Sequence, residues 1–383
     1  MPPDNPSLTA RIDYNRHHPG ATAPATRHIL DVFHGQIQAG LHPGAQLVVL
    51  HQGLPLVDVA AGQAQRRRPQ PVRPETVFLT FSVTKAFTAA CIHRLLEEGR
   101  LAWDEPVASY WPEFGRNHKH TITLRQVLCH QAGLPTRGMY AFLPLWPFPS
   151  LSARAIAAVR PQYPPGSLTA YHLLNYGFIL GEIIRRVSGQ PPEQYLSDTF
   201  LTPLGLTHTW LGWPRGRDWQ RAGIYAGDPG QRTPVRLFNL PLIRRTPQAA
   251  ATLHSTAREL AIFYQMLLNG GLYAGQRFLR PETIADALRL AYDGKDYTMG
   301  ARMRWASGFH LGGTYNRGVA TGSGMGQAST QRTFGHFGHN SCMAWADPDA
   351  QIVVAFTVNQ LLDRVPSAAR WQAISDAVWA AAA

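Results

Sequence analysis

Strand patterns near both ends of this 383-residue chain, with helical patterns between them, constrain its fold most strongly. Two β-rich runs, 45–51 and 54–61, flank Gln52-Gly53 and predict a hairpin. Much later in the chain, 343–345 and 352–358 are also typical of strands, and a proline-containing turn joins them. The simplest assembly places both strand pairs in one antiparallel sheet.

Amphipathic helices accompany the strands at both ends. Near the N-terminus, Ile29, Val32, Phe33 and Ile37 recur at helical spacing and predict a helix that ends near Gly40. At the C-terminal end, three apolar residues at the same spacing indicate a closing helix: Trp371, Ile374 and Val378. We expect both helices to cover the sheet.

The middle of the chain is mostly helical by the same criterion. Six further helices are expected, over 82–98, 124–131, 153–160, 172–187, 257–268 and 282–290. Thr123 with Gln126, and Thr256 with Glu259, have the spacing of capping boxes, which satisfy backbone N–H groups at a helix start.

These patterns predict an α/β fold, in which N- and C-terminal strands form an antiparallel sheet flanked by helices and a large, mostly helical lobe is inserted. With 45% hydrophobic residues, the chain can bury a sizeable core. We expect a single domain over 1–383, with an α/β lobe of 25–81 plus 305–383 and a helical lobe of 82–304.

The net charge of +12 raises the question of a nucleic-acid partner. The longest basic run is only Arg66 to Arg68, and the other arginines are scattered, so we expect a basic enzyme surface and no nucleic-acid binding. Residues 1–27 contain no apolar run typical of a signal peptide, and 18 apolar residues never run together. A soluble, cytoplasmic protein without membrane contact is expected.

The cysteines and histidines give no sign of a disulfide framework or a metal site. Cys91, Cys129 and Cys342 form no Cys-x-x-Cys pattern, and we expect reduced thiols. His336, His339 and Cys342 lie three residues apart, a spacing that matches no structural zinc pattern. We therefore expect no metal and no cofactor.

Ser82 and Lys85 are the first candidates for chemistry. They lie three apart at the predicted start of a helix, where their side chains share one face. A serine hydroxyl becomes a strong nucleophile when a neighbouring base takes its proton, and a lysine can do so only when neutral. Chance could produce this pair, with the serine capping and the lysine solvated. Against that, the chain has only three lysines, Lys85, Lys119 and Lys295, among 36 Lys and Arg residues.

Two further segments could complete a site. Tyr171 precedes a predicted helix and could carry protons between nucleophile, lysine and leaving group, although a tyrosine in this position is often merely packed. A short strand over 334–339 carries His336, which could donate a hydrogen bond to the substrate. The His339 amide could then join the Ser82 amide in an oxyanion hole.

The chain resembles the group of serine hydrolases that contains class C β-lactamases, DD-peptidases and family VIII carboxylesterases. The matching segments occur in the family's order: Ser82-Val-Thr-Lys85, Ile122–Pro135, Tyr171-His172-Leu173, Gly181–Ile184, Pro203–Leu206, Gly335–Gly338 and Trp345–Pro348. The resemblance implies a β-lactamase/transpeptidase-like fold, an acylated Ser82, and acid and base work shared by Lys85 and Tyr171.

Two departures from the family pattern bear on the substrate. Leu173 replaces the asparagine of Tyr-x-Asn, and His336-Phe337-Gly338 replaces Lys-Thr-Gly. An amide, an ammonium and a hydroxyl that hold lactams or peptides are thus absent. With Leu173, Phe337, Gly338 and His339 as substrate-binding residues, we expect a carboxylesterase or acyltransferase acting on a small-molecule ester. A β-lactamase, a DD-peptidase-like amidase and a catalytically silent binding relative are the alternatives, and nothing indicates the oligomeric state.

Overall fold

The computed structural model describes residues 10–66, 69–134, 145–313 and 324–382. Arg67, Arg68 and Pro135, which belong to patterns discussed above, lie outside these ranges.

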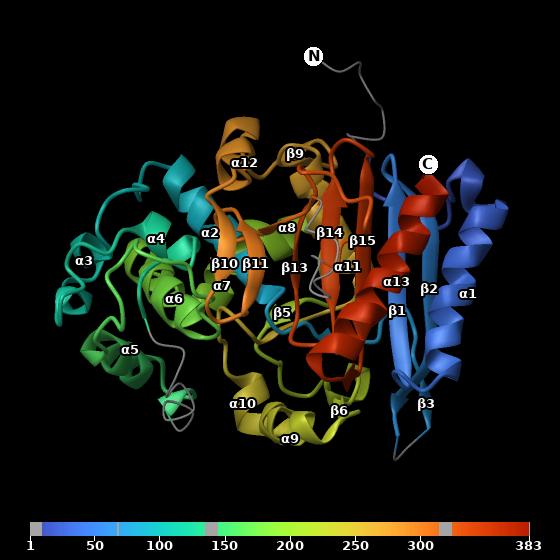
Figure 1. The fold of residues 1–383 in the computed structure, drawn as a ribbon, viewed down its shortest axis with the longest axis horizontal. Helices are drawn as coiled ribbons and strands as arrows, with labels where there is room; N and C mark the ends of the chain where they lie inside the picture. Colours follow the sequence, from blue (N-terminus) through green and yellow to red (C-terminus); the bar gives the residue numbers. More distant parts are fainter. Residues whose placement is uncertain (1–9, 67–68, 135–144, 314–323, 383) are drawn as a thin grey trace.

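A nine-stranded antiparallel sheet forms the centre of the molecule (Figure 1). Its strand order is β10-β11-β12-β13-β14-β15-β1-β2-β3. The strands are β1 (Gly44–His51), β2 (Leu54–Gln65), β3 (Gln70–Pro71), β10 (Tyr292–Asp296), β11 (Ala301–Trp305), β12 (His310–Leu311), β13 (Phe334–Phe337), β14 (Met343–Asp347) and β15 (Ile352–Val358). β1 pairs with β15, so the predicted union of the N-terminal hairpin with the C-terminal strands is confirmed.

Both faces of the sheet are covered, which explains why β1 is apolar at nearly every position. Leu47 and Val49 point to the core beneath α1 (Pro24–Gln38) and α13 (Arg364–Ala382), whereas Val48 and Leu50 point to the core of the helical lobe. Figure 1 shows α1 and α13 side by side over one face. The two predicted terminal helices are therefore confirmed.

The inserted lobe contains most of the other helices. They are α2 (Thr84–Glu97), α3 (Val107–Tyr110), α4 (Leu124–Leu128), α5 (Pro149–Ala158), α6 (Asn175–Ser188), α7 (Pro192–Leu196), α8 (Thr202–Leu204), α9 (Arg232–Asn239), α10 (Pro241–Arg245), α11 (Ala257–Leu268) and α12 (Pro281–Ala287). α2 lies at the centre of this lobe, with 11 buried residues, and it packs on α6. Its first turn can therefore hold polar groups away from water.

Short strands outside the main sheet tie the lobe together. β4 (Phe78–Leu79), β7 (Leu253–Ser255) and β5 (Trp210–Leu211) form a three-stranded sheet. Two further pairs join β6 (Tyr225–Ala226) to β16 (Gln360–Leu361), and β8 (Leu272–Tyr273) to β9 (Gln276–Arg277). The β4–β7 pairing fixes the segment that leads into α2.

Three local predictions need correction. The helix expected from 172 begins at Asn175, which leaves Tyr171 to Leu174 in an extended connection. The sequence patterns predict no strand over 292–305, yet β10 and β11 extend the sheet there; Asp293, Gly294 and Lys295 are weak strand formers, so their pairing depends on neighbours.

The second predicted capping box is only half formed. Thr256 accepts a hydrogen bond from the Glu259 amide, as a cap should. The Glu259 carboxylate, however, accepts from the His208 amide and the Thr209 hydroxyl instead of returning to Thr256. A tertiary contact thus displaces the local one. The box at Thr123 and Gln126 is complete.

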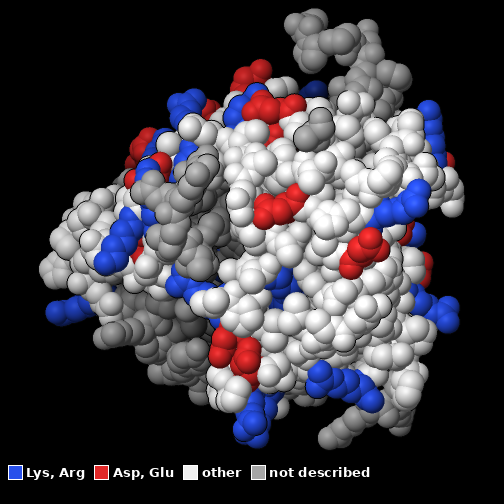
Figure 2. All heavy atoms as spheres, turned by 45° about the vertical axis from the view of Figure 1, so that its right-hand side comes forward, with Lys and Arg blue, Asp and Glu red and all other residues white. Residues whose placement is uncertain are grey.

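The distribution of charge, the cysteines and the length of the apolar helices are each the subject of a sequence prediction. Figure 2 shows acidic and basic side chains dispersed over the displayed face, without a continuous basic patch there. The three cysteines are buried and carry free thiols. Among the described residues, no helix combines the length and apolar character needed to cross a bilayer.

Candidate active site

Ser82 lies in a tight turn between β4 and α2. The preceding Phe81 adopts a left-handed backbone conformation with φ of 47°, which is costly for a bulky residue and is maintained by its surroundings. The Thr84 hydroxyl donates to the Phe81 carbonyl and accepts from the Leu253 amide, so β7 anchors the turn. The turn leaves Ser82 partly exposed at the wall of a cavity.

Lys85 lies one helical turn later and is fully buried. Its Nζ is 3.1 Å from Ser82 Oγ, 2.7 Å from the Leu173 carbonyl oxygen and 3.1 Å from the Ala250 carbonyl oxygen. Burial lowers the pKa of Lys85 well below its usual value. The structure therefore brings together the two residues that the Ser-x-x-Lys spacing singles out.

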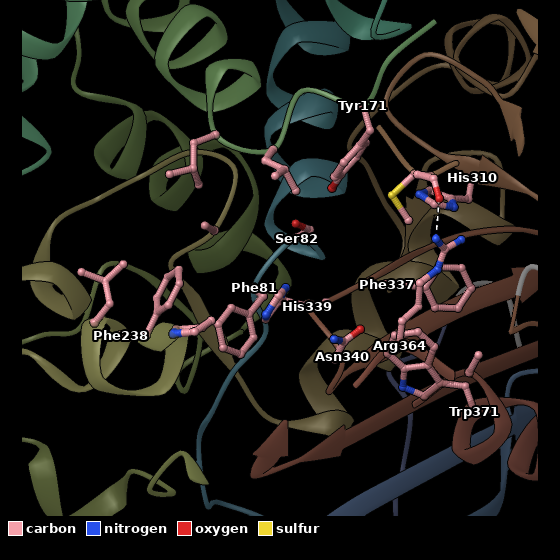
Figure 3. A pocket seen from close by; sticks show the side chains of 18 of the residues that line it. Phe81, Ser82, Tyr171, Phe238, His310, Phe337, His339, Asn340, Arg364 and Trp371 are labelled. Atoms are coloured by element: carbon pink, nitrogen blue, oxygen red, sulfur yellow. Dashed lines mark hydrogen bonds between the residues drawn. The ribbon is translucent and has the colours of Figure 1, made fainter. Parts of the chain in front are cut away.

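Tyr171 completes this group. A hydrogen bond joins its side chain to Ser82, and Figure 3 shows the hydroxyl directed toward that serine. Its ring stacks on Trp305 at a centroid distance of 5.3 Å, and the Lys85 Nζ is 4.7 Å from the Tyr171 centroid. Burial raises the pKa of Tyr171, while the bond to Ser82 opposes that shift. The phenol consequently stays protonated at neutral pH.

The end of β13 approaches the Ser82 turn closely. A Cβ atom on Gly338 would lie 2.3 Å from the Thr80 carbonyl oxygen, so only glycine permits this approach. Among the described residues, neither the Ser82 amide nor the His339 amide has a hydrogen-bond acceptor. Both donors are thus available for a developing oxyanion, the role that the sequence predicts for them.

The geometry of His336 differs from the predicted one. Its Nδ1 lies 3.0 Å from the Phe337 carbonyl oxygen, which can only accept, so Nδ1 carries the proton. Nε2 is then an acceptor, and it is buried without a partner. Burial lowers the pKa of His336, and its side chain does not line the cavity. Neutral His336 therefore has no free N–H to donate to a substrate.

Other histidines pack behind the site. His130, His172 and His310 are buried, and burial lowers the pKa of each, so the surroundings of Lys85 are largely neutral. Of these three histidines, His310 alone lines the cavity, and no sequence pattern identified it. Among the described residues, no three His, Cys, Asp or Glu side chains converge as possible metal ligands.

The cavity beside Ser82 has a volume of about 380 Å³ and is mostly apolar. Of the predicted substrate-binding residues, Leu173, Phe337, Gly338 and His339 all line it. In Figure 3, Ser82 lies between two groups of lining residues. Phe81 and Phe238 lie on one side, and the other contains His310, Phe337, Arg364 and Trp371.

Comparison with known proteins identifies the family. The family described as Beta-lactamase matches residues 31–378, nearly the whole chain. The chain belongs to the beta-lactamase family. The resemblance inferred from the motifs is therefore confirmed, and so is the predicted fold.

Relatives of this beta-lactamase family member include both esterases and penicillin-binding proteins. "Esterase/beta-lactamase LipL" of Mycobacterium tuberculosis is 29% identical over 375 residues, which cover 90% of this chain and 83% of LipL. A solved family VIII carboxylesterase has a TM-score of 0.80 at 28% identity, with 94% of this chain and 98% of that one covered.

A penicillin-binding protein homologue from Caulobacter crescentus is similar to the same extent, with a TM-score of 0.79 at 29% identity and coverage of 94% and 98%. Together these relatives show a serine hydrolase of the beta-lactamase family. Because these relatives include both esterases and a penicillin-binding protein homologue, the substrate class has to be inferred from the cavity.

Proposed function

We propose that this protein is a carboxylesterase that acts through an acyl-Ser82 intermediate, with Lys85 as general base. The three contacts of the Lys85 Nζ carry the proposal. A neutral amine has two N–H groups and one lone pair, and two backbone carbonyls, those of Leu173 and Ala250, take the N–H groups. The lone pair is left to accept the Ser82 hydroxyl proton at 3.1 Å.

The acylation step follows from this arrangement. Ser82 Oγ bonds to the ester carbonyl carbon as its proton passes to Lys85, and the Ser82 and His339 amides stabilise the oxyanion. The bond to the alcohol then breaks: Tyr171 passes its proton to the departing alkoxide and receives in turn the proton that Lys85 took from Ser82. Water or a second alcohol releases the acyl group by the reverse sequence.

The orientation of the substrate follows from the place of Tyr171. Because Tyr171 protonates the leaving group, the alcohol lies on its side of Ser82, against Met299, His310 and Phe337. The acyl group then lies on the opposite side, against Phe81 and Phe238. Both walls are mostly apolar, with the cation of Arg364 at the edge of the alcohol side, which favours esters with apolar groups on either side of the carbonyl.

The same lining disfavours lactams and peptides. Leu173 and Phe337 provide no partner for a side-chain amide or a carboxylate, and neutral His336 provides no cation. Arg364, a cation that lines the cavity, donates to the Met299 carbonyl oxygen. An unpartnered buried polar group costs about 1–3 kcal/mol, so two missing contacts reduce turnover by a factor of roughly 10². The names of LipL and the family VIII carboxylesterase agree with an ester substrate.

The test compares p-nitrophenyl esters of increasing chain length with nitrocefin. We expect kcat/KM for short- or medium-chain esters to exceed that for nitrocefin at least by roughly a hundredfold. Intact-mass spectrometry with a fluorophosphonate probe should show one label, which Ser82→Ala removes. Equal turnover of nitrocefin and p-nitrophenyl butyrate would favour a β-lactamase, and absence of the label would refute the nucleophile.

A further inference from the structure

A buried carboxylate outside the predicted site holds several of its parts. Asp296 ends β10, is 0% exposed, and does not line the cavity. Its Oδ1 accepts from the Tyr171 amide at 3.1 Å, and its Oδ2 accepts from the Trp305 indole N–H at 3.1 Å. The same Trp305 ring stacks on the Tyr171 ring. Asp296 thus bonds both to the backbone of Tyr171 and to Trp305, whose ring stacks on the Tyr171 ring.

Asp296 also joins Tyr171 to the wall of the proposed alcohol side. Its Oδ1 accepts from the Thr298 and Met299 amides at 2.9 and 2.8 Å, and Met299 lines the cavity. In addition, the Tyr297 amide donates to the Thr169 carbonyl, so the turn after β10 clamps the segment before α6 at two points.

We propose that Asp296 is a positioning residue for Tyr171, which sets the phenol where it can protonate the departing alcohol. The inference rests on the proposed function, because it assigns Tyr171 that proton transfer. All four donors to Asp296 are N–H groups, and none is a cation, so the carboxylate gains hydrogen bonds rather than an ion pair. Its negative charge also raises the pKa of Tyr171, which keeps the phenol protonated.

The simpler explanation is that Asp296 only closes a turn. Asp347 shows what that role looks like: it is also 0% exposed, and its Oδ1 accepts from the Asp349 and Ala350 amides at 2.9 and 2.8 Å. Its other oxygen accepts from the hydroxyls of Thr330 and Thr333. Asp347 therefore matches Asp296 in burial and turn contacts, but it has no bond to Tyr171 or Trp305.

The experiment measures kcat/KM for two esters of the same acid, one with p-nitrophenol and one with ethanol. An alkoxide needs a proton to leave, whereas p-nitrophenolate leaves without one. For Asp296→Asn and Asp296→Ala we expect the ethyl ester to lose at least roughly tenfold more activity than the p-nitrophenyl ester. Asp347→Asn should reduce both esters by the same factor. Equal losses in the Asp296 variants would overturn the proposal.

A double-mutant cycle with Tyr171→Phe separates the two hypotheses. If Asp296 acts through Tyr171, adding Asp296→Asn to Tyr171→Phe causes little further loss on the ethyl ester, so the effects are non-additive. Additive losses would refute the positioning role of Asp296 but leave the proposed role of Tyr171 intact. If Tyr171→Phe itself left both esters unaffected, the proposed function of Tyr171 would fail instead. Fluorophosphonate labelling of Ser82 should persist in every folded variant. Loss of the label in Asp296→Asn would mean that Asp296 supports the reactivity of Ser82 rather than the position of Tyr171.

Discussion

At the residue scale, the two buried lysines show how contacts decide chemistry. Lys119 Nζ contacts three carbonyl oxygens, those of Arg116, Ala157 and Val159, which together suit an ammonium with three N–H groups. Lys85 Nζ contacts two carbonyls and one hydroxyl. Only Lys85 therefore has a neighbour whose proton it can accept.

The first prediction follows from this contrast. Lys85→Arg should be nearly as damaging as Lys85→Ala, with at least about a 10³-fold loss of kcat, because a guanidinium cannot be deprotonated in a protein. Lys119→Ala is the matched control and should lower the melting temperature but leave kcat of the folded protein within a few fold. An Lys85→Arg variant with near wild-type turnover would reduce Lys85 to a structural residue.

The second prediction concerns Tyr171. Tyr171→Phe keeps the ring stacked on Trp305 but removes the hydroxyl that bonds to Ser82. We expect kcat for a short-chain alkyl ester to fall by about 10²-fold or more, with little change in KM. Steady-state kinetics would show this division, and an unchanged kcat would mean that Tyr171 is merely a packed aromatic residue.

At the element scale, the approach of β13 to the turn before α2 creates the oxyanion hole. The third prediction is that Gly338→Ala disrupts it, because the new Cβ would lie 2.3 Å from the Thr80 carbonyl oxygen. We expect a loss of stability of about 1–3 kcal/mol and a larger loss of kcat than of substrate affinity. Gly35→Ala in α1 is the control: its Cβ meets nothing within 4 Å, so activity should remain unchanged and stability should rise slightly.

The elements that sequence reasoning predicted well are those whose apolar residues form a clear local pattern. β1, β15 and α2 are buried along nearly their whole lengths, so each is visible in the sequence as a mostly apolar segment. β10 was missed because its residues owe their strand conformation to pairing with β11.

The candidate site divides in the same way. Ser82 and Lys85 are related by one helical turn, and the sequence alone brings them together. Asp296 is far from Tyr171 in the sequence and bonds to it only in the folded chain, and His310 reaches the cavity beside Ser82 in the same way. No local sequence pattern therefore revealed either residue. The tautomer of His336 likewise depends on where its ring lies relative to Phe337.

At the scale of the whole molecule, buried histidines make stability depend on pH. Seven are buried with a lowered pKa: His42, His93, His130, His172, His254, His310 and His336. For His172, burial lowers the pKa from 6.5 to about 4, and for His310 to about 3. In this range the unfolded chain binds more protons than the folded one, so the free energy of unfolding falls as pH falls.

The fourth prediction is a loss of stability below pH 6.5 that continues to about pH 3, the lower end set by His310, with His172 contributing down to about pH 4. Urea midpoints measured at half-unit pH steps would show it. His172→Phe should flatten the slope, because one buried titrating group is removed. An identical slope in the His172 variant would contradict the assignment.

The pairing of β1 with β15 also has a consequence for biosynthesis. The hairpin of β1 and β2 is complete at Gln65, but its neighbour β15 begins only at Ile352. At roughly 5–20 residues per second, a ribosome needs about 15–60 s to reach that strand. During this time the apolar edge of β1 has no partner within the sheet and is open to aggregation. This edge of β1 is therefore paired only after the last strands of the chain have been made.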